Sequence, residues 1–486
     1  MLSYGQNTMM KWQRIFCYLV HLESRVNTCM LSNKIIEQIR TGELVLHCVE
    51  VEVFQAAENG FRMLGHGTIK INSVGTLYLE FICTYSENVP RAFFNEKLPR
   101  DPLNYEEKLY LRTKTLDDNE YKSDGFSITI NIHSSASPTH YDVILSSIYS
   151  LHDTELPKPK EDSYLYFEFA DYFKIPSNKQ NSLVSSLGSE SYSWNQTVIS
   201  MNDYSISMVK HRGYTEVNVA GCFELDKLFK CLRFYIGFSS ASMPQPYYTK
   251  SIINGKEKRT FYSISNKQKR QTSSSPMVDN AGDEKYRNST YHYALLENII
   301  SLYTENPKQF DSLYSQWERV WYSFQSKNSI MILTLSVAIE GLLNDIYIPA
   351  IKSKNENTEL NNEINKIKIQ IKKLDLTNEQ CNRLLGSVSY WKNITAAKAL
   401  DYLIKCDVIT AKDKKLWQKI RNESAHPKVR EEDLAKEKLE LEQVLSCLDL
   451  FHKLILNTLK FSGPIRVLQL RKNYNYVELN HIDVLS

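Results

Sequence analysis

The sequence predicts an α+β protein of more than one domain, in which a β-rich N-terminal region (an antiparallel sandwich or barrel) precedes an α-helical bundle. Three observations predict this class. The chain has 486 residues, which is more than one ordinary domain holds. Short alternating segments dominate residues 43–241, whereas apolar residues at helical spacing dominate from Tyr293 onward. A polar stretch, residues 263–288, has almost nothing to bury and separates the two patterns.

Strands are predicted where β-branched and aromatic residues alternate with polar ones between turn-forming residues. The turn Asn72-Ser-Val-Gly75 joins two of them, and Gly75 is free to adopt a positive φ. A single helix, 225–234, interrupts this region with apolar residues three and four apart. The clearest predicted strands are 43–54, 67–72, 75–85, 125–133, 163–169 and 195–210.

The C-terminal half shows apolar stripes with helical period and few glycines, which is typical of a helix bundle. The predicted helices are 293–303, 309–324, 329–350, 361–374, 378–385, 395–404, 411–425 and 431–460. The predicted domains are therefore a β-rich region at 1–262, a linker or loop at 263–288, a helical domain at 289–463 and a tail at 464–486.

Composition excludes several classes of protein. The 9 cysteines are odd in number and contain no Cys-x-x-Cys pair, so they are predicted to be reduced thiols rather than disulfides or a zinc site, which favours a cytoplasmic location. The apolar run 330–340 is about half of a membrane span and is interpreted as a buried helix. No metal, cofactor or membrane contact is predicted. The net charge of +3 says little about partners, so an argument for nucleic acid must come from local clusters.

One such cluster lies at residues 411–430. Seven cations oppose two acids there, and this density favours approach of a polyanion, although a solvated helix face explains many such runs. The lysines predicted to contact RNA are Lys414, Lys415, Lys419 and Lys428.

Within the cluster, Arg421 and His426 form the candidate catalytic pair. Positions five apart on an unbroken helix point about 140° away from each other. Pro427 disfavours the α conformation at His426, so the helix is predicted to end there and the imidazole is freed to turn toward Arg421. Arginine can hold phosphate oxygens in a planar fork, and histidine can move the proton of a ribose 2′-hydroxyl or of a leaving 5′-oxygen. This chemistry needs no metal if arginine supplies the charge stabilisation.

The segment Arg421-Asn422-Glu423-Ser424-Ala425-His426 resembles the motif of the HEPN superfamily, in which an arginine, a polar residue and a histidine lie near the end of a bundle helix. The segment 338–343, Ala-Ile-Glu-Gly-Leu-Leu, resembles the first long helix of ApeA-like HEPN domains and brings Glu340 as a supporting polar group beside Asn422. Segments 67–81 and 225–237 resemble, more faintly, the N-terminal region of the same proteins.

The resemblance implies a metal-independent endoribonuclease that acts as a homodimer in anti-phage defence. It implies that an unknown phage trigger at the N-terminal region releases cleavage of cellular RNA, tRNA among the candidates, and that growth then halts by abortive infection. The alternative is an inactive HEPN-like bundle that serves as a dimerisation or RNA-binding adaptor. Three further Arg/His pairs have similar spacing but lack the bundle-helix context, and they are Arg14 with His21, Arg40 with His47, and Arg287 with His292.

Overall fold

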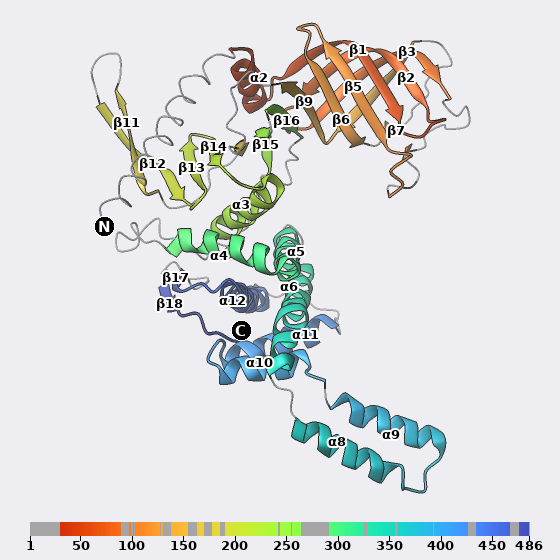
Figure 1. Cartoon of the computed structure of the whole chain (residues 1–486), viewed down its shortest axis with the longest axis vertical. Helices are drawn as coiled ribbons and strands as arrows, with labels where there is room; N and C mark the ends of the chain where they lie inside the picture. Colours follow the sequence, from red (N-terminus) through yellow and green to blue (C-terminus); the bar gives the residue numbers. More distant parts are fainter. Residues whose placement is uncertain are drawn as a thin grey trace, which may run out of the picture. The chain divides into compact units, whose positions relative to one another are not determined.

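The computed structural model in Figure 1 describes residues 30–88, 97–98, 101, 103–126, 128–129, 138–153, 163–169, 177–184, 190–241, 244–253, 255–263, 291–324, 328–354, 358–391, 393–425, 434–466 and 476–485. The chain forms two compact units. The first unit comprises Met1–Lys160, Tyr166–Ala170 and Pro246–Asn266, and the second comprises Glu161–Leu165, Asp171–Gln245 and Lys267–Ser486. Each is described below by itself. A large antiparallel sheet in the N-terminal half followed by helices confirms the predicted α+β class.

In the residues that the structure describes, the first unit is a strongly curved antiparallel sheet accompanied by the helix α2 (Met30–Thr41) (Figure 1). Its strands pair in the order β15-β16-β9-β6-β5-β1-β2-β3-β8. A two-stranded pair, β4 (Lys97–Leu98) with β7 (Ile128–Thr129), accompanies it. The bounds of the other strands are β1 (Val45–Gln55), β2 (Arg62–Ile71), β3 (Leu77–Glu87), β5 (Leu109–Thr115), β6 (Glu120–Phe126), β8 (Thr139–Leu145), β9 (Ser147–Asp153), β10 (Ser163–Phe169), β15 (Pro246–Ile253) and β16 (Lys256–Tyr262).

Alternation sets the inner face of this sheet. In β3 every second side chain, from Leu77 to Cys83, is buried, as the pleat requires for a sheet with one covered face. The predicted turn between β2 and β3 is confirmed: the Gly75 amide donates to the Asn72 carbonyl at 2.8 Å, and Gly75 has a φ of 82°. Gly65 of β2 has no room for a side chain, because a Cβ there would lie 1.9 Å from the carbonyl oxygen of Ile82.

A buried carboxylate fastens α2 to this unit. The Glu168 side chain of β10 is fully buried and accepts hydrogen bonds from Arg40 Nη2 at 2.7 Å and Arg40 Nε at 2.9 Å. The hydroxyls of Tyr166 and Tyr247 also donate to it. Burial lowers the pKa of Arg40, but the hydrogen bonds that Arg40 donates to Glu168 raise it above its ordinary value, so the charge stays paired in the interior. The guanidinium of Arg40 is therefore engaged by Glu168, Tyr247 and Glu37.

The second unit contains β strands, a helix bundle and a short C-terminal strand pair. The sheet part has the order β11-β12-β13-β14. The bounds are β11 (Lys179–Val184), β12 (Glu190–Ser200), β13 (Tyr204–His211), β14 (Tyr214–Gly221), α3 (Leu225–Ser240), α4 (Tyr291–Glu305), α5 (Pro307–Ser323), α6 (Asn328–Leu342), a π-helical turn (Leu343–Tyr347), α7 (Ile348–Lys354), α8 (Thr358–Ile371), α9 (Asn378–Tyr390), α10 (Ala396–Lys405), α11 (Ala411–Ala425), α12 (Leu434–Thr458), β17 (Gly463–Arg466) and β18 (Tyr476–Leu479).

Some predicted bounds differ from the structure. The predicted strand 195–210 is two strands, β12 and β13, that turn at residues 201–203. The predicted helix 329–350 contains the π-helical turn between α6 and α7. The two units also divide the chain at other points than the predicted domain boundaries, because residues 171–245 group with the helices.

The reason for that grouping is an aromatic cluster under α3. The ring of Phe234 packs edge-on against Phe310, Tyr314 and Trp317 of α5, with centroids 5.1 to 6.0 Å apart. At the surface, Lys230 Nζ lies 2.5 Å from Asp311. α3 is thus a core helix of the bundle, although it follows the strands in sequence.

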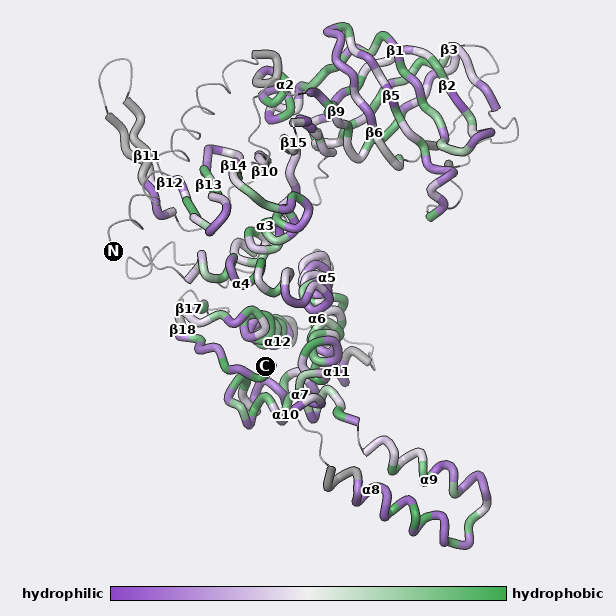
Figure 2. Tube along the Cα trace, in the orientation of Figure 1, coloured by the Kyte–Doolittle hydropathy of each residue, from purple (hydrophilic) through white to green (hydrophobic). Residues whose placement is uncertain are grey.

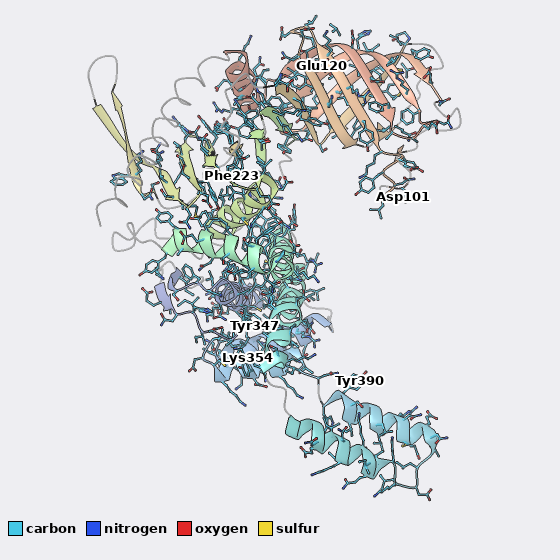
Figure 3. All side chains as sticks on the ribbon, in the orientation of Figure 1. Asp101, Glu120, Phe223, Tyr347, Lys354 and Tyr390 are labelled. Carbon is cyan, nitrogen blue, oxygen red and sulfur yellow. The ribbon has the colours of Figure 1, made fainter. Side chains whose placement is uncertain are left out.

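The stretch Ile330–Lys354 is long and apolar enough to cross a membrane by length and composition alone, but half of its most apolar part is buried within the protein. Figure 2 shows the hydrophobic residues that continue along α6 and α12. Tyr347 lies inside the bundle (Figure 3), where its hydroxyl donates to the Leu454 carbonyl at 2.7 Å. This packing is typical of a core helix in a soluble protein, as predicted.

His452 of α12 is a buried titratable group in the same core. Its ring lies 5.3 Å from Phe238, and its Nδ1 has no hydrogen-bond partner in the described part of the chain. Burial lowers the pKa of His452 to about 3, so the imidazole is neutral in the folded protein. The ordinary pKa is about 6.5. The unfolded chain therefore binds one more proton than the folded chain between these values, and stability falls as the pH falls below about 6.5.

We expect His452→Phe to remove this acid sensitivity while keeping the aromatic volume. Between pH 7.5 and pH 5, the free energy of unfolding of the wild-type chain should fall by about 2 kcal/mol more than that of the variant. Urea denaturation followed by helical circular dichroism at the two pH values measures this difference. His140→Phe, at an exposed histidine of β8, is the control and should behave as wild type. Equal pH dependence of His452→Phe and the wild type would contradict the assignment.

Candidate functional site

The candidate site is built on α11, which begins where the sequence places it. Thr410 caps the helix: its hydroxyl accepts from the Asp413 amide at 3.2 Å, and Asp413 Oδ2 accepts from the Thr410 amide at 2.9 Å. This reciprocal arrangement satisfies two amides that a helix start leaves open. Lys453 Nζ of α12 lies 3.5 Å from the same carboxylate. One of the two acids of the basic segment is therefore engaged in starting the helix.

Trp417 holds α11 against α6. Its indole is buried and donates from Nε1 to the Ser336 carbonyl at 3.2 Å, and the neighbouring Ile420 is also buried. A buried indole N–H needs such a partner. The contact fixes the rotation of α11 and decides which residues of its last two turns face outward.

Arg421 and Glu340 meet beside this contact. Arg421 Nε lies 2.9 Å from Glu340 Oε2, and Arg421 Nη2 lies 3.0 Å from Glu340 Oε1. The guanidinium carbon also lies 5.7 Å from the centre of the Trp417 ring. The hydrogen bonds that Arg421 donates to Glu340 raise the pKa of Arg421, which is charged in either case. The structure thus brings together two of the residues that the sequence selected from distant helices.

The geometry of this pair leaves part of the guanidinium available. Glu340 binds along the Nε and Nη2 edge, and a guanidinium has five N–H donors. Neither of these two hydrogen bonds engages Nη1, so the edge formed by Nη1 and Nη2 has donors for another planar or tetrahedral anion. The Arg421 side chain as a whole is 49% exposed. Such a pair contributes at most about 1 kcal/mol to stability, and its main effect is to orient the guanidinium.

The lysines of α11 divide into two groups. Lys414 Nζ lies 2.6 Å from Asp401 of α10, so its charge is already balanced. Lys415 and Lys419 are exposed, and with Asn422 they lie at i, i+4 and i+7 on one ridge of the helix. Asn422 is exposed as well. Lys428 lies outside the described residues.

His426 also lies outside the described residues, together with Pro427 and Arg430. α11 ends at Ala425, as the predicted bounds 411–425 have it. Of the other Arg/His pairs, Arg14 and His21 lie outside the described part, as does Arg287. The approach of His426 to Arg421 stays a prediction.

One feature of α6 was not selected from the sequence. Ile330, Leu333 and Val337 are each about half exposed and fall on the same face as Glu340. The sequence shows this helix as apolar on nearly every side, so periodicity could not separate core residues from these three. Only the packing of the opposite face, with Leu335 and Ile339 fully buried, reveals them.

No metal centre or disulfide is formed among the residues that the structure describes. No group of three or more His, Cys, Asp and Glu side chains there could hold a metal ion. The seven cysteines of the described ranges are free thiols, and Cys48, Cys83, Cys231 and Cys447 are buried. Burial raises the pKa of the Cys447 thiol to about 12, so it is an unreactive core side chain.

Comparison with known proteins adds no relative. No family model, no curated protein and no solved structure matches this chain. The function is therefore argued from the site.

Proposed function

We propose that this protein is a metal-independent endoribonuclease of the HEPN type, in which Arg421 binds the scissile phosphate and His426 transfers the proton. The observation that carries the proposal is the guanidinium of Arg421, which Glu340 orients on a half-exposed side chain near the end of α11. The sequence supplies the histidine five residues later, at position 426. Exposed Lys415 and Lys419 on the same helix favour approach of a polyanion.

The reaction that these residues support is transesterification of RNA. The ribose 2′-oxygen attacks the adjacent phosphorus, the bond from phosphorus to the 5′-oxygen breaks, and the products carry a 2′,3′-cyclic phosphate and a 5′-hydroxyl. His426 accepts the 2′-hydroxyl proton or donates a proton to the leaving oxygen. The Nη1 and Nη2 edge of Arg421 binds the non-bridging phosphate oxygens as their charge increases. Glu340 is a positioning residue that keeps this edge outward.

A second copy of the chain fits the exposed face of α6. Ile330, Leu333 and Val337 form an apolar strip whose exposure to water is unfavourable. A twofold axis that pairs two copies of the chain would bury the strip of each copy against that of the other. Glu340 and Arg421 lie at the end of this strip, so pairing would bring two sites close together. The positive charge of both copies would then act on one RNA.

The biological setting that the ApeA-like resemblance supports is anti-phage defence in the cytoplasm. An unknown phage trigger acts through the β-rich N-terminal region, and cleavage of cellular RNA, including tRNA, then halts growth. One observation favours the alternative of an inactive adaptor: Glu340 balances the charge of Arg421 in the described geometry. The two readings differ in whether RNA is cut.

The first test is growth arrest on induced expression in a bacterial host. We expect the wild-type chain to arrest growth and His426→Ala to relieve the arrest, because loss of a general acid or base costs about 10²- to 10⁴-fold in rate. RNA binding by the purified variant should survive. His140→Ala is the matched control and should stay toxic. Equal growth with wild type and His426→Ala would favour the adaptor.

Arg421→Lys tests the phosphate fork. A lysine ammonium is a point charge that can pair with Glu340 but cannot also present a planar edge to phosphate, so we expect cleavage to fall at least about tenfold. The rate on a labelled RNA, followed by gel, is the measurement. Arg62→Lys is matched, because Arg62 has the same 49% exposure and pairs with Glu52 in the first unit. Full activity of Arg421→Lys would contradict the role.

The proposed dimer face is tested with Leu333→Arg, at the centre of the strip. A buried, unpaired cation there should shift the protein from dimer to monomer and reduce cleavage without lowering stability, since Leu333 is about half exposed in the single chain. Analytical ultracentrifugation gives the mass. Leu151→Arg, at a similarly exposed residue of β9, should leave the dimer intact. A Leu333→Arg dimer of unchanged affinity would exclude this face.

A further inference from the structure

The antiparallel hairpin of α8 and α9 is a separate packing element of the second unit. The two helices lie between α7 and α10 in the chain and pack chiefly on each other. Ile364 and Ile371 of α8 and Val388 of α9 form a small core of their own. The outward faces of the hairpin therefore have no part in closing the main bundle core.

The end of α8 carries unbalanced positive charge. Between Glu363 and Asp375 the charged residues are four lysines and no acid, namely Lys366, Lys368, Lys372 and Lys373. None of their ammonium groups has a carboxylate partner in the part of the chain that the structure describes. By contrast, Glu379 of α9 is balanced by Arg383 at 2.7 Å. The lysines are thus available to an external anion.

Large apolar groups accompany these lysines at the surface. Tyr390 is 72% exposed and Trp391 is 49% exposed, and they follow one another where α9 ends toward α10 (Figure 3). Ile369 and Leu374, beside the lysines, are more than half exposed. Figure 2 shows this mixture of hydrophilic and hydrophobic residues along both helices. Exposed aromatic rings gain most from a partner with flat faces.

A group of ammonium groups around the end of α8 and two exposed rings, about 20 Å apart along a helix of this length, match the two parts of an RNA strand. Ammonium groups bind phosphates, and aromatic rings stack on unpaired bases. We infer that the α8–α9 hairpin is an RNA-binding arm, with its lysines on the backbone and with Tyr390 and Trp391 under unpaired bases. The inference rests on the proposed ribonuclease function, because it names where the same substrate is held outside the cleavage site.

The test measures binding of a fluorescein-labelled, unstructured single-stranded RNA by fluorescence anisotropy. The full-length chain carries His426→Ala in every case so that the RNA stays intact. One variant adds Lys372→Glu and Lys373→Glu, and another adds Tyr390→Ala and Trp391→Ala. The control adds Lys34→Glu and Lys256→Glu at exposed lysines of the first unit. Both lysine variants change the formal net charge from +3 to 3 − 4 = −1.

We expect the hairpin lysine variant to lose about tenfold or more in affinity and the slope of log K against log salt to become shallower by about 1.4, as for two lost contacts to a single strand. The aromatic variant should lose about tenfold with an unchanged slope. The control should stay within twofold. Circular dichroism should show the same helix content in all of these variants. If the aromatic variant loses helix content, the inference is judged on the RNA affinity of the lysine variant alone.

The arm is excluded if the hairpin lysine variant binds RNA like its parent, or if the control loses as much affinity. It is also excluded if the hairpin substitutions abolish binding to vesicles of phosphatidylserine and phosphatidylcholine while RNA affinity is unchanged, because the surface then serves a membrane. The nuclease proposal is judged separately by cleavage with and without His426→Ala. If cleavage depends on His426 but the hairpin substitutions leave RNA affinity unchanged, the nuclease proposal stands and the RNA-binding arm is excluded. If RNA affinity depends on the hairpin but the wild-type chain cuts no RNA, the arm stands and the nuclease proposal is excluded.

Discussion

The candidate site depends on how α11 lies against α6. Trp417 donates to the carbonyl of Ser336, and Arg421 pairs with Glu340. From the first contact to the second, the chain advances by four residues on each helix, from Trp417 to Arg421 on α11 and from Ser336 to Glu340 on α6. The two helices therefore run in the same direction at this contact. A shift of α11 by one turn would break the buried hydrogen bond and the ion pair together. The exposed arginine is therefore positioned by a buried tryptophan.

Because the buried contact positions α11, the weak Arg421–Glu340 pair at the surface is sufficient to orient the guanidinium. The Arg421–Glu340 pair adds little to stability, whereas burial of Trp417 and Ile420 contributes several kcal/mol. The core contact fixes the backbone of α11, and the surface pair then only has to choose one orientation of the guanidinium. A preorganised guanidinium loses less side-chain freedom when it meets a phosphate.

Periodicity and turn chemistry predicted much of the fold. The bounds of α11 and of β10 agree with the prediction, because capping at Thr410 and alternation in β10 are local signals. The split of 195–210 into β12 and β13 was missed, because both strands continue the same alternation across a turn that contains no glycine or proline. The pairing of Lys414 with Asp401 was not predictable either, since it joins two helices whose relative rotation is set by tertiary packing.

The same limit applies to the site. Glu340 was selected only through a family resemblance, and nothing in its local sequence indicates that it meets Arg421, 81 residues away. The exposed strip on α6 was missed for a different reason. Because this helix is apolar on nearly every side, its sequence pattern does not show which face is exposed.

The aromatic cluster under α3 constrains how the N-terminal region can act on the helices. Phe234 is fully buried against Phe310, Tyr314 and Trp317, so α3 cannot leave the bundle without exposing four large rings to water. Exposure of that apolar area would cost several kcal/mol, which is comparable to the stability of a whole domain. A displacement of the strands before α3 is therefore more easily accommodated by a small shift of α3 and α5 as one body than by their separation. α5 in turn packs on α6, which carries Glu340, so such a shift ends at the helix that orients Arg421.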